Sequence, residues 1–308
     1  MFKPDKILSN LKLKPLFLIG FSFLPLATCA EDNSWVLQTS VNTASGRYVD
    51  SIALKSMQSL GFRFSAEKDQ KWGLEMGVQS TDIDMQPFFP QKRQNQDDWM
   101  LSGYFHLPAD PIPGRLTFQV DTYRTINDAF QAIGSDVSAW APKVSWQSSE
   151  LPLNLDLSYG HSAYKGVNSI RQMSAGLQYG FNGARDWIQI RGYRIEDLTP
   201  SSALGKEHLT ATDIKYTHII GNHKSWIPNS LTLGLESGKK IYYIDMVSQS
   251  IYNLPMLNEG GTNIALNWEV SPKASMNVQW SRNKYRADQP ALHHYDFSVL
   301  STQITKAW

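Results

Sequence analysis

Residues Gln172 to Tyr193, QMSAGLQYGFNGARDWIQIRGY, carry the pattern that decides the fold. Before the Asn182-Gly183 turn, apolar residues alternate with small or polar ones, which is the period of two of a β-strand. The alternation resumes at Trp187, so the stretch is predicted to form a β-hairpin. One side is apolar with aromatic residues near both ends, and the other is small and polar. This pattern favours strands with lipid on one side and water on the other.

Composition points in the same direction. The chain has 308 residues, a formal charge of +1 and 12% aromatic residues. The near-zero charge gives no support for nucleic acid or for an acidic ligand as partner, and no nucleic-acid partner is predicted. The mean hydropathy of −0.35 is too polar for a bundle of membrane helices, but it suits a β-barrel, in which half of each strand is polar.

The amino terminus has the features of a secretory signal peptide. Lysines precede an apolar run from Leu16 to Leu26, which is followed by Ala27-Thr28-Cys29-Ala30. Cleavage near Ala30 is expected, because an apolar run this short does not span a membrane. The mature chain would then contain no cysteine and no disulfide, since Cys29 is the only one. Leu26 to Cys29 also resembles a lipobox, so acylation of Cys29 is the alternative.

Alternating segments continue from Trp35 to the end of the chain, separated by residues that favour turns. Polar loops are expected at Ser45-Gly46-Arg47 and from Ile83 to Asp97. The predicted strands run approximately over Trp35–Asn42, Ala53–Ser65, Trp72–Gln79, Trp99–Leu107, Arg115–Asp121, Val137–Gln147, Leu153–Gly160, Gln172–Phe181, Trp187–Tyr193, Leu209–Ile220, Leu231–Ser248, Asn263–Val270, Met276–Ser281 and His294–Trp308.

The strand number depends on the ambiguous stretch Gly238 to Tyr252. A turn at Lys239-Lys240 would give an odd number, whereas closed bacterial barrels have an even number of strands with both ends in the periplasm. Leu231 to Ser248 is therefore predicted to be one long strand that projects above the bilayer. The fold class predicted is all-β, a single closed antiparallel transmembrane barrel over residues 31–308 with about 14 strands, and 12 or 16 are the alternatives. Asn182-Gly183 is then expected at the periplasmic end.

A soluble β-sandwich or propeller would also show alternation. The predicted strands are long for a soluble sheet but match a tilted membrane crossing. Several tryptophans lie near strand ends or on the apolar side, as expected for interfacial girdles. The membrane barrel is therefore favoured.

The signal peptide, the repeated hairpins and the aromatic carboxyl terminus resemble the Gram-negative outer-membrane β-barrel class over Trp35 to Trp308. In that class the assembly machinery recognises apolar residues at alternate positions of the last strand. Leu300, Ile304 and Trp308 fit this assembly signal, whereas Thr302 and Lys306 depart from it. The resemblance implies an outer-membrane location, with lipid, lipopolysaccharide and the barrel assembly machinery as partners.

The polar side of the strands is predicted to line the lumen. Its charges are of mixed sign, so they could orient polar solutes, or they could pair with one another and rigidify the wall. The predicted lumen residues are Arg63, Glu75, Tyr104, Arg115, Asp121, Tyr123, Lys143, Asp156, Arg191, Tyr193, Asp213, Lys215, Glu236 and Glu269.

Fourteen strands enclose a lumen wide enough for water unless loops fill it. The loops Ile83 to Asp97 and Asn253 to Gly261 are the predicted constrictions. The predicted function is a passive, weakly selective pore for small hydrophilic solutes, with no cofactor. Polysaccharide export and scaffolding of an envelope complex share this sequence signature. The oligomeric state is left open.

An outer-membrane lipid hydrolase is the competing hypothesis. Outer-membrane phospholipases resemble this architecture and use a His-x-Ser pair near the outer surface. His223-Lys224-Ser225 has the spacing but falls in a predicted periplasmic turn, and the adjacent His161 and Ser162 would point to opposite faces. The histidines show no metal-binding spacing, so no catalytic or metal residue is assigned.

Overall fold

The computed structural model describes residues 35–88, 90–108, 113–128, 136–165, 169–198, 208–221, 227–245, 248–251, 256–287 and 293–308, all within the compact unit Trp35–Trp308. The predicted signal peptide, Cys29 and the His223-Lys224-Ser225 triplet lie outside the described residues. No helix in the described ranges is long and apolar enough to cross a membrane.

The barrel wall consists of fourteen antiparallel strands, as the sequence predicts. The strands are β1 (Trp35–Val49), β2 (Leu54–Lys68), β3 (Trp72–Met85), β4 (Arg93–Pro108), β5 (Gly114–Asn127), β6 (Asp136–Ser148), β7 (Leu153–Tyr164), β8 (Ser169–Phe181), β9 (Asp186–Asp197), β10 (His208–Ile219), β11 (Ser230–Lys240), β14 (Met256–Ser271), β15 (Ala274–Ala287) and β16 (His293–Ala307).

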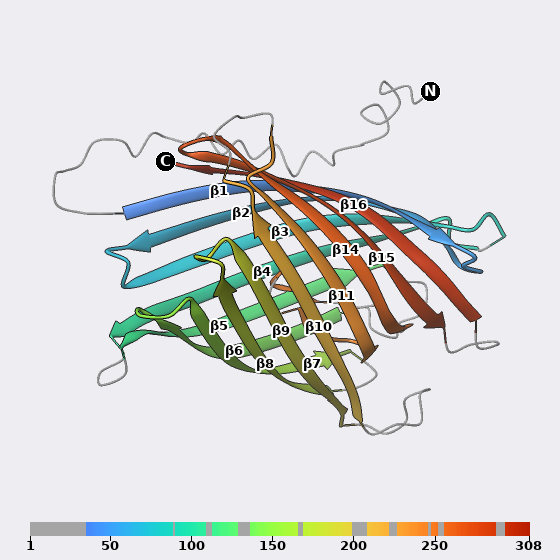
Figure 1. The fold of residues 1–308 in the computed structure, drawn as a ribbon. Coiled ribbons are helices and arrows are strands. Elements are labelled where there is room, and N and C mark those ends of the chain that lie inside the picture. Colours follow the sequence, from blue (N-terminus) through green and yellow to red (C-terminus); the bar gives the residue numbers. More distant parts are fainter. Residues whose placement is uncertain are drawn as a thin grey trace. The chain divides into compact units, whose positions relative to one another are not determined.

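Each strand pairs with its neighbours in sequence, and β1 closes the barrel against β16 (Figure 1). The closing ladder runs from Gln38 opposite Ala307 to Val49 opposite Asp296. Trp308 extends it, because its backbone N–H donates to the carbonyl of Leu37. Closure leaves no unpaired strand edge in the wall, as a lipid environment requires.

Alternation gives the wall two chemically different faces. On the hairpin of β8 and β9, the large side chains of Met173, Leu177, Ile188 and Ile190 are exposed on one face, as expected. Gln172, Ser174 and Arg191 lie on the other face and are buried. The same division repeats around the barrel, with Phe62, Leu74, Leu101, Leu155 and Leu235 among the exposed apolar residues. The exposed apolar face is the outer face, and the opposite face lines the lumen.

Short turns at one end of the barrel follow the sequence closely. Residues 182–185 connect β8 to β9, with positive φ angles of 52° at Asn182 and 65° at Gly183. Asp69 and Gln70 both have φ of 53° between β2 and β3, as the two central residues of a type I′ hairpin require. Asp69, Asn182 and Gly183 are residue types that tolerate the left-handed region, whereas Gln70 and Ala184 (φ 61°) adopt it without that preference.

At the opposite end the strands are longer than predicted, and two loop predictions are wrong. Ser45, Gly46 and Arg47 continue β1, where they pair with β2 and β16. The predicted loop from Ile83 to Asp97 is reduced to residues 86–92, because Ile83 pairs with Gln94 in the ladder of β3 and β4. These strands continue beyond the apolar band with polar residues. In that part the strand is formed by backbone pairing, without the apolar alternation that marks a strand in the sequence.

The prediction of one long strand from Leu231 to Ser248 is also wrong, although the strand number is right. Strand β11 ends at Lys240, after the pairing with β14 shifts between Ser237 and Lys240. Gly238 (φ 96°) and Gly260 (φ 109°) adopt a backbone conformation that other residues rarely tolerate. This irregularity releases the chain from the wall, and the predicted loop from Asn253 to Gly261 is mostly strand, since β14 begins at Met256.

Candidate pore constriction

Residues 241–245 and 248–251, which lie between β11 and β14, form a small hairpin, called here the inner hairpin. Its described residues include two short strands, β12 (Ile244–Asp245) and β13 (Ser250–Ile251), which pair with each other. The Asp245 side chain accepts a hydrogen bond from the backbone N–H of Ser248 at 3.2 Å. The hairpin is therefore an ordered element with its own backbone pairing.

The contacts of the inner hairpin place it inside the barrel. It hydrogen-bonds to Arg63 of β2 and to Gln172 of β8, and Ile244 packs against Met100 of β4 and Tyr123 of β5. These strands come from widely separated parts of a closed wall. A single segment reaches all of them only by crossing the lumen.

Gln172 clamps the hairpin to the wall. Its side-chain amide donates to the carbonyl of Ile244 at 2.7 Å and accepts from the Ile244 N–H at 3.0 Å. Tyr164 adds a hydrogen bond from its hydroxyl to the carbonyl of Tyr242 at 3.0 Å. Gln172 and Ile244 are almost completely buried, so these bonds satisfy backbone groups that water cannot reach.

Apolar packing adds to the clamp on this side of the lumen. Tyr242 lies in a buried cluster, and its ring is 4.6 Å from that of Tyr164. Burial raises the pKa of Tyr242 to about 12, and the negative charge of Asp197 contributes, so the phenol stays neutral at physiological pH. The other buried members of this cluster are Val137, Ile170, Ile195, Leu209 and Leu257.

A buried lysine lies at the start of the hairpin. The Lys240 ammonium is 2.5 Å from Asp213 and 3.4 Å from Glu236, and it lies over the rings of Tyr193 and Tyr243. Its side chain is only 4% exposed. Two carboxylates and two aromatic faces therefore compensate a desolvated charge at the point where the chain leaves the wall.

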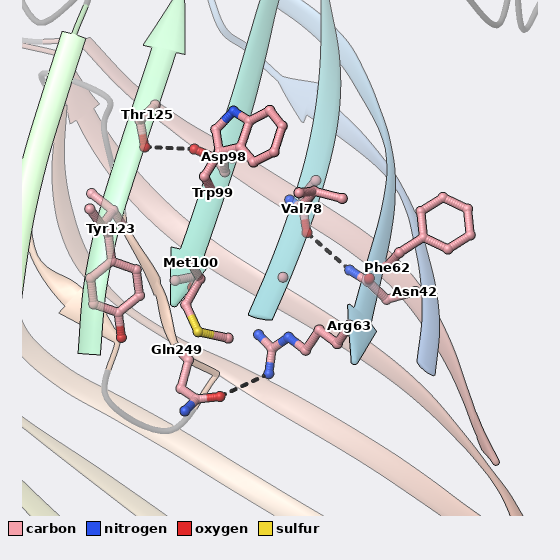
Figure 2. Close-up of a pocket in the computed structure, with 14 residues that line it drawn as sticks. Asn42, Phe62, Arg63, Val78, Asp98, Trp99, Met100, Tyr123, Thr125 and Gln249 are labelled. Carbon is pink, nitrogen blue, oxygen red and sulfur yellow. Dashed lines mark hydrogen bonds between the residues drawn. The ribbon is translucent and has the colours of Figure 1, made fainter. Parts of the chain in front are cut away.

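Arg63 holds the tip of the hairpin from the other side of the lumen. Its guanidinium donates to the Gln249 side chain at 3.1 Å (Figure 2). It also donates to the carbonyl of Ser248 and lies 3.5 Å from Glu75. Figure 2 shows Arg63, Met100 and Tyr123 on the side of Gln249, whereas Phe62 and Trp99 point away from it. The hairpin is thus fixed at both sides of the lumen.

The predicted lumen residues all lie on the inner face, and several of them interact. Arg63 meets Glu75, and Arg191 meets Asp156 at 2.7 Å. Hydrogen bonds also join Tyr104 to Glu67, Arg115 to Gln147 and Tyr123 to Asp121. Asp213 and Glu236 converge on Lys240, and Tyr193 lies beneath it. Lys143, Lys215 and Glu269 lie on the same face, opposite Ser158, Gly234 and Ser275 respectively. That these residues line a conducting pore remains a prediction.

Lys240, Gln172 and the whole inner hairpin were not predicted from the sequence as parts of the site. The role of glycines on the inner face was not predicted either. An added Cβ at Gly176 would collide with Asp156 and Arg191, so the glycine leaves the room that this ion pair fills. The sequence sign of this role was the presence of small residues, such as Gly176, among the polar positions that alternate with apolar ones along the strand.

Other predicted residues have separate positions. Leu300, Ile304 and Trp308 are exposed on the outer face of β16 and at its end, but nothing in the fold tests their role in assembly. His161 and Ser162 are consecutive in β7 and point to opposite faces. Within the described ranges, no group of three or more His, Cys, Asp or Glu side chains is placed to hold a metal ion.

Comparison with known proteins gives the fold its class. No family model and no curated protein matches the sequence. The toluene transporter TodX of Pseudomonas putida matches with a TM-score of 0.52 and 11% identity over 90% of each chain. The fold is that of the Gram-negative outer-membrane β-barrels. The monoaromatic hydrocarbon channel CymD (TM-score 0.53, 8% identity, 89% of this chain and 88% of that chain) and a Pseudomonas aeruginosa FadL homologue (0.51, 9%, 88% and 90%) are also similar.

The clamp makes a testable prediction. Gln172→Ala removes both side-chain bonds to Ile244 and leaves its backbone groups buried without partners, at a cost of about 1–3 kcal/mol. We expect faster amide hydrogen exchange in residues 241–251 than in the wild type, measured by mass spectrometry. Gln178→Ala is the matched control, because Gln178 lies on the same face of β8 but bonds to Asn154 in the wall. Equal exchange in both variants would contradict the role of Gln172.

Proposed function

We propose that this protein is an outer-membrane channel through which small hydrophilic solutes diffuse passively and with weak selectivity, past the inner hairpin. The observation that carries the proposal is a single ordered segment crossing a lumen whose wall is polar and charged. A wall of fourteen strands is wide enough to hold water, and the hairpin narrows it. Charges of both signs on the wall favour neither cations nor anions strongly.

The similar structures include hydrocarbon channels, so a path for apolar solutes is the second candidate. Apolar side chains do lie on the inner face, including Val137, Ile195 and Leu257. They are almost completely buried, largely beneath the inner hairpin, and are not open to a solute. Lys143 and Lys215 are partly exposed and polar, whereas the partly exposed inner residues Met57 and Phe297 pack against a separate buried cluster that includes Tyr48. This distribution supports the hydrophilic path.

The outer face supports a place in the outer membrane with the end that carries the inner hairpin on the outside. Apolar side chains cover the middle of this face. Toward that end the outward residues become charged: Arg124, Arg171 and Arg194 are all exposed, and Arg124 and Arg194 form ion pairs with Asp136 and Glu196. Arginines at this level suit the phosphates of lipopolysaccharide, which we propose as the lipid partner on that side.

The first test is fractionation followed by conductance. We expect the mature protein in the outer-membrane fraction, with a heat-modifiable mobility on a gel and stepwise ion conductance in planar bilayers. Recovery from the soluble periplasm would refute the outer-membrane barrel. A folded barrel that never conducts would refute the channel and favour scaffolding or an enzyme. Fatty acid released from phospholipid, and lost in His223→Ala, would favour the lipid hydrolase.

A further inference from the structure

A pocket lies between the inner face of β1–β5 and the inner hairpin. Its lining brings together one cation, Arg63, and one carboxylate, Asp98, with Gln249 beside the first and Thr125 beside the second (Figure 2). Gln79 also lines the pocket. Tyr123 and Met100 supply its apolar surface. A small-molecule site typically combines apolar surface with a small number of polar groups that point into the pocket, and this pocket has both.

We propose that this pocket binds a small zwitterionic solute, with its carboxylate at Arg63 and its ammonium group at Asp98. The inference rests on the proposed function, because the solute reaches the pocket only through the lumen. It deepens that function by naming a solute class for which the channel has a binding site.

Arg63 retains hydrogen-bonding capacity after its contacts with the protein. Its Nη1 donates to Gln249 and Glu75, and its Nη2 donates to the carbonyl of Ser248. Arginine has five N–H donors in a fork that fits a carboxylate, so Nε and Nη2 each keep one N–H without a partner among the described residues. The side chain is 30% exposed, which leaves it open to a solute.

Asp98 supplies the opposite charge. Its carboxylate accepts from Thr125 at 2.6 Å and from the Gln96 amide at 3.0 Å, and these neutral donors fix its orientation. No Lys, Arg or His in the described ranges forms an ion pair with Asp98. A partly buried, oriented carboxylate without a cation is a site for an ammonium group.

The pairing of the strands sets the separation of the two charges. Arg63 is opposite Gly77, which is opposite Met100, so Asp98 lies two strands across and two residues along from Arg63. Strand spacing and rise then place the two Cα atoms about 12 Å apart. The arginine side chain spans part of this distance. The gap fits a zwitterion whose charges are separated by several carbon atoms better than an α-amino acid.

Gly77 forms the floor between the two ends of the pocket. A Cβ at this position would be 3.3 Å from the Cγ of Arg63 and 3.5 Å from the Cε of Met100. A larger side chain would therefore occupy the pocket without altering either charge. The variant Gly77→Val therefore tests whether binding depends on the shape of the pocket, because it leaves both charged residues in place.

The test is isothermal titration calorimetry on the folded channel in detergent at constant ionic strength. The probes are 4-aminobutyrate, glycine, butyrate, butylamine and glucose. We expect 4-aminobutyrate to bind at least about tenfold more tightly than each of the others, a difference of about 1.4 kcal/mol. Equal binding of butyrate, butylamine or glucose would overturn the zwitterion assignment.

Variants locate the site. Asp98→Asn should reduce 4-aminobutyrate affinity at least about tenfold, and Gly77→Val should do so without removing a charge. Asp84→Asn is the matched control, since Asp84 pairs with Arg93 on the outer face and should leave binding unchanged. Binding that survives both Asp98→Asn and Gly77→Val would overturn the proposal, as would an equal loss in Asp84→Asn.

Conductance separates this inference from the proposed function. A channel that conducts but shows no preference for 4-aminobutyrate refutes the zwitterion site alone. A barrel that binds 4-aminobutyrate through Asp98 but never conducts supports the site and refutes the channel.

Discussion

Replacing residues 242–254 by Gly-Ser-Gly is expected to raise the single-channel conductance roughly two- to fivefold, because it removes the segment that crosses the lumen of a wide barrel. The wall should still fold, since β11 ends at Lys240, β14 begins at Met256 and their pairing along the wall does not involve the inner hairpin. Single-channel recording in planar bilayers measures the effect.

A second loop at the same end of the barrel provides the control. Residues 87–91 lie between β3 and β4. The Gln86 side chain donates to the carbonyls of Ser51 and Leu54, and the Gln91 side chain donates to the carbonyl of Asp128, so the contacts of this loop are at the rim of the barrel. Replacing 87–91 by Gly-Ser-Gly should leave conductance near that of the wild type. Unchanged conductance in the inner-hairpin deletion, with heat-modifiability retained, would show that the hairpin does not limit the passage.

The barrel was predictable from sequence because a wall strand repeats one local rule. Met173 and Leu177 on one face and Gln178 on the other are set by alternation within a single segment. The parity of bacterial barrels then gave the correct strand number. Strand length was underestimated at the end where polar residues replace apolar ones, since pairing such as that of Ile83 with Gln94 has no hydrophobic signature.

The constriction was not predictable for a different reason. Ile241 to Ile244 is apolar and follows β11 without a proline, so it resembles a continued strand. Its actual partners are distant in sequence: Gln172 is 72 residues from Ile244, and Arg63 is 186 from Gln249. Only the three-dimensional closure of the wall brings them together. Gly238 was the local sign of the departure, because its positive φ accompanies the shift in pairing.

The ion pair of Arg191 and Asp156 is expected to contribute more to stability than any exposed charge pair on this barrel. Two hydrogen bonds of 2.7 Å join the guanidinium to both carboxylate oxygens, and the Arg191 side chain is 6% exposed. Arg191→Ala leaves a carboxylate without its cation in a partly buried place, where loss of one partner typically costs about 3–5 kcal/mol. Urea unfolding of the barrel in lipid vesicles measures the loss in free energy of unfolding.

Arg194→Ala is the matched control for this prediction. Arg194 lies on the same strand but faces outward, is 60% exposed and pairs with Glu196, so its removal should cost less than about 1 kcal/mol. The double variant Arg191→Met/Asp156→Leu should regain most of the loss, because it removes both charges and fills the space over Gly176 with apolar atoms. If Arg191→Ala costs no more than Arg194→Ala, the pair does not stabilise the wall. If the double variant is as unstable as the single one, the loss comes from packing rather than from the unpaired charge.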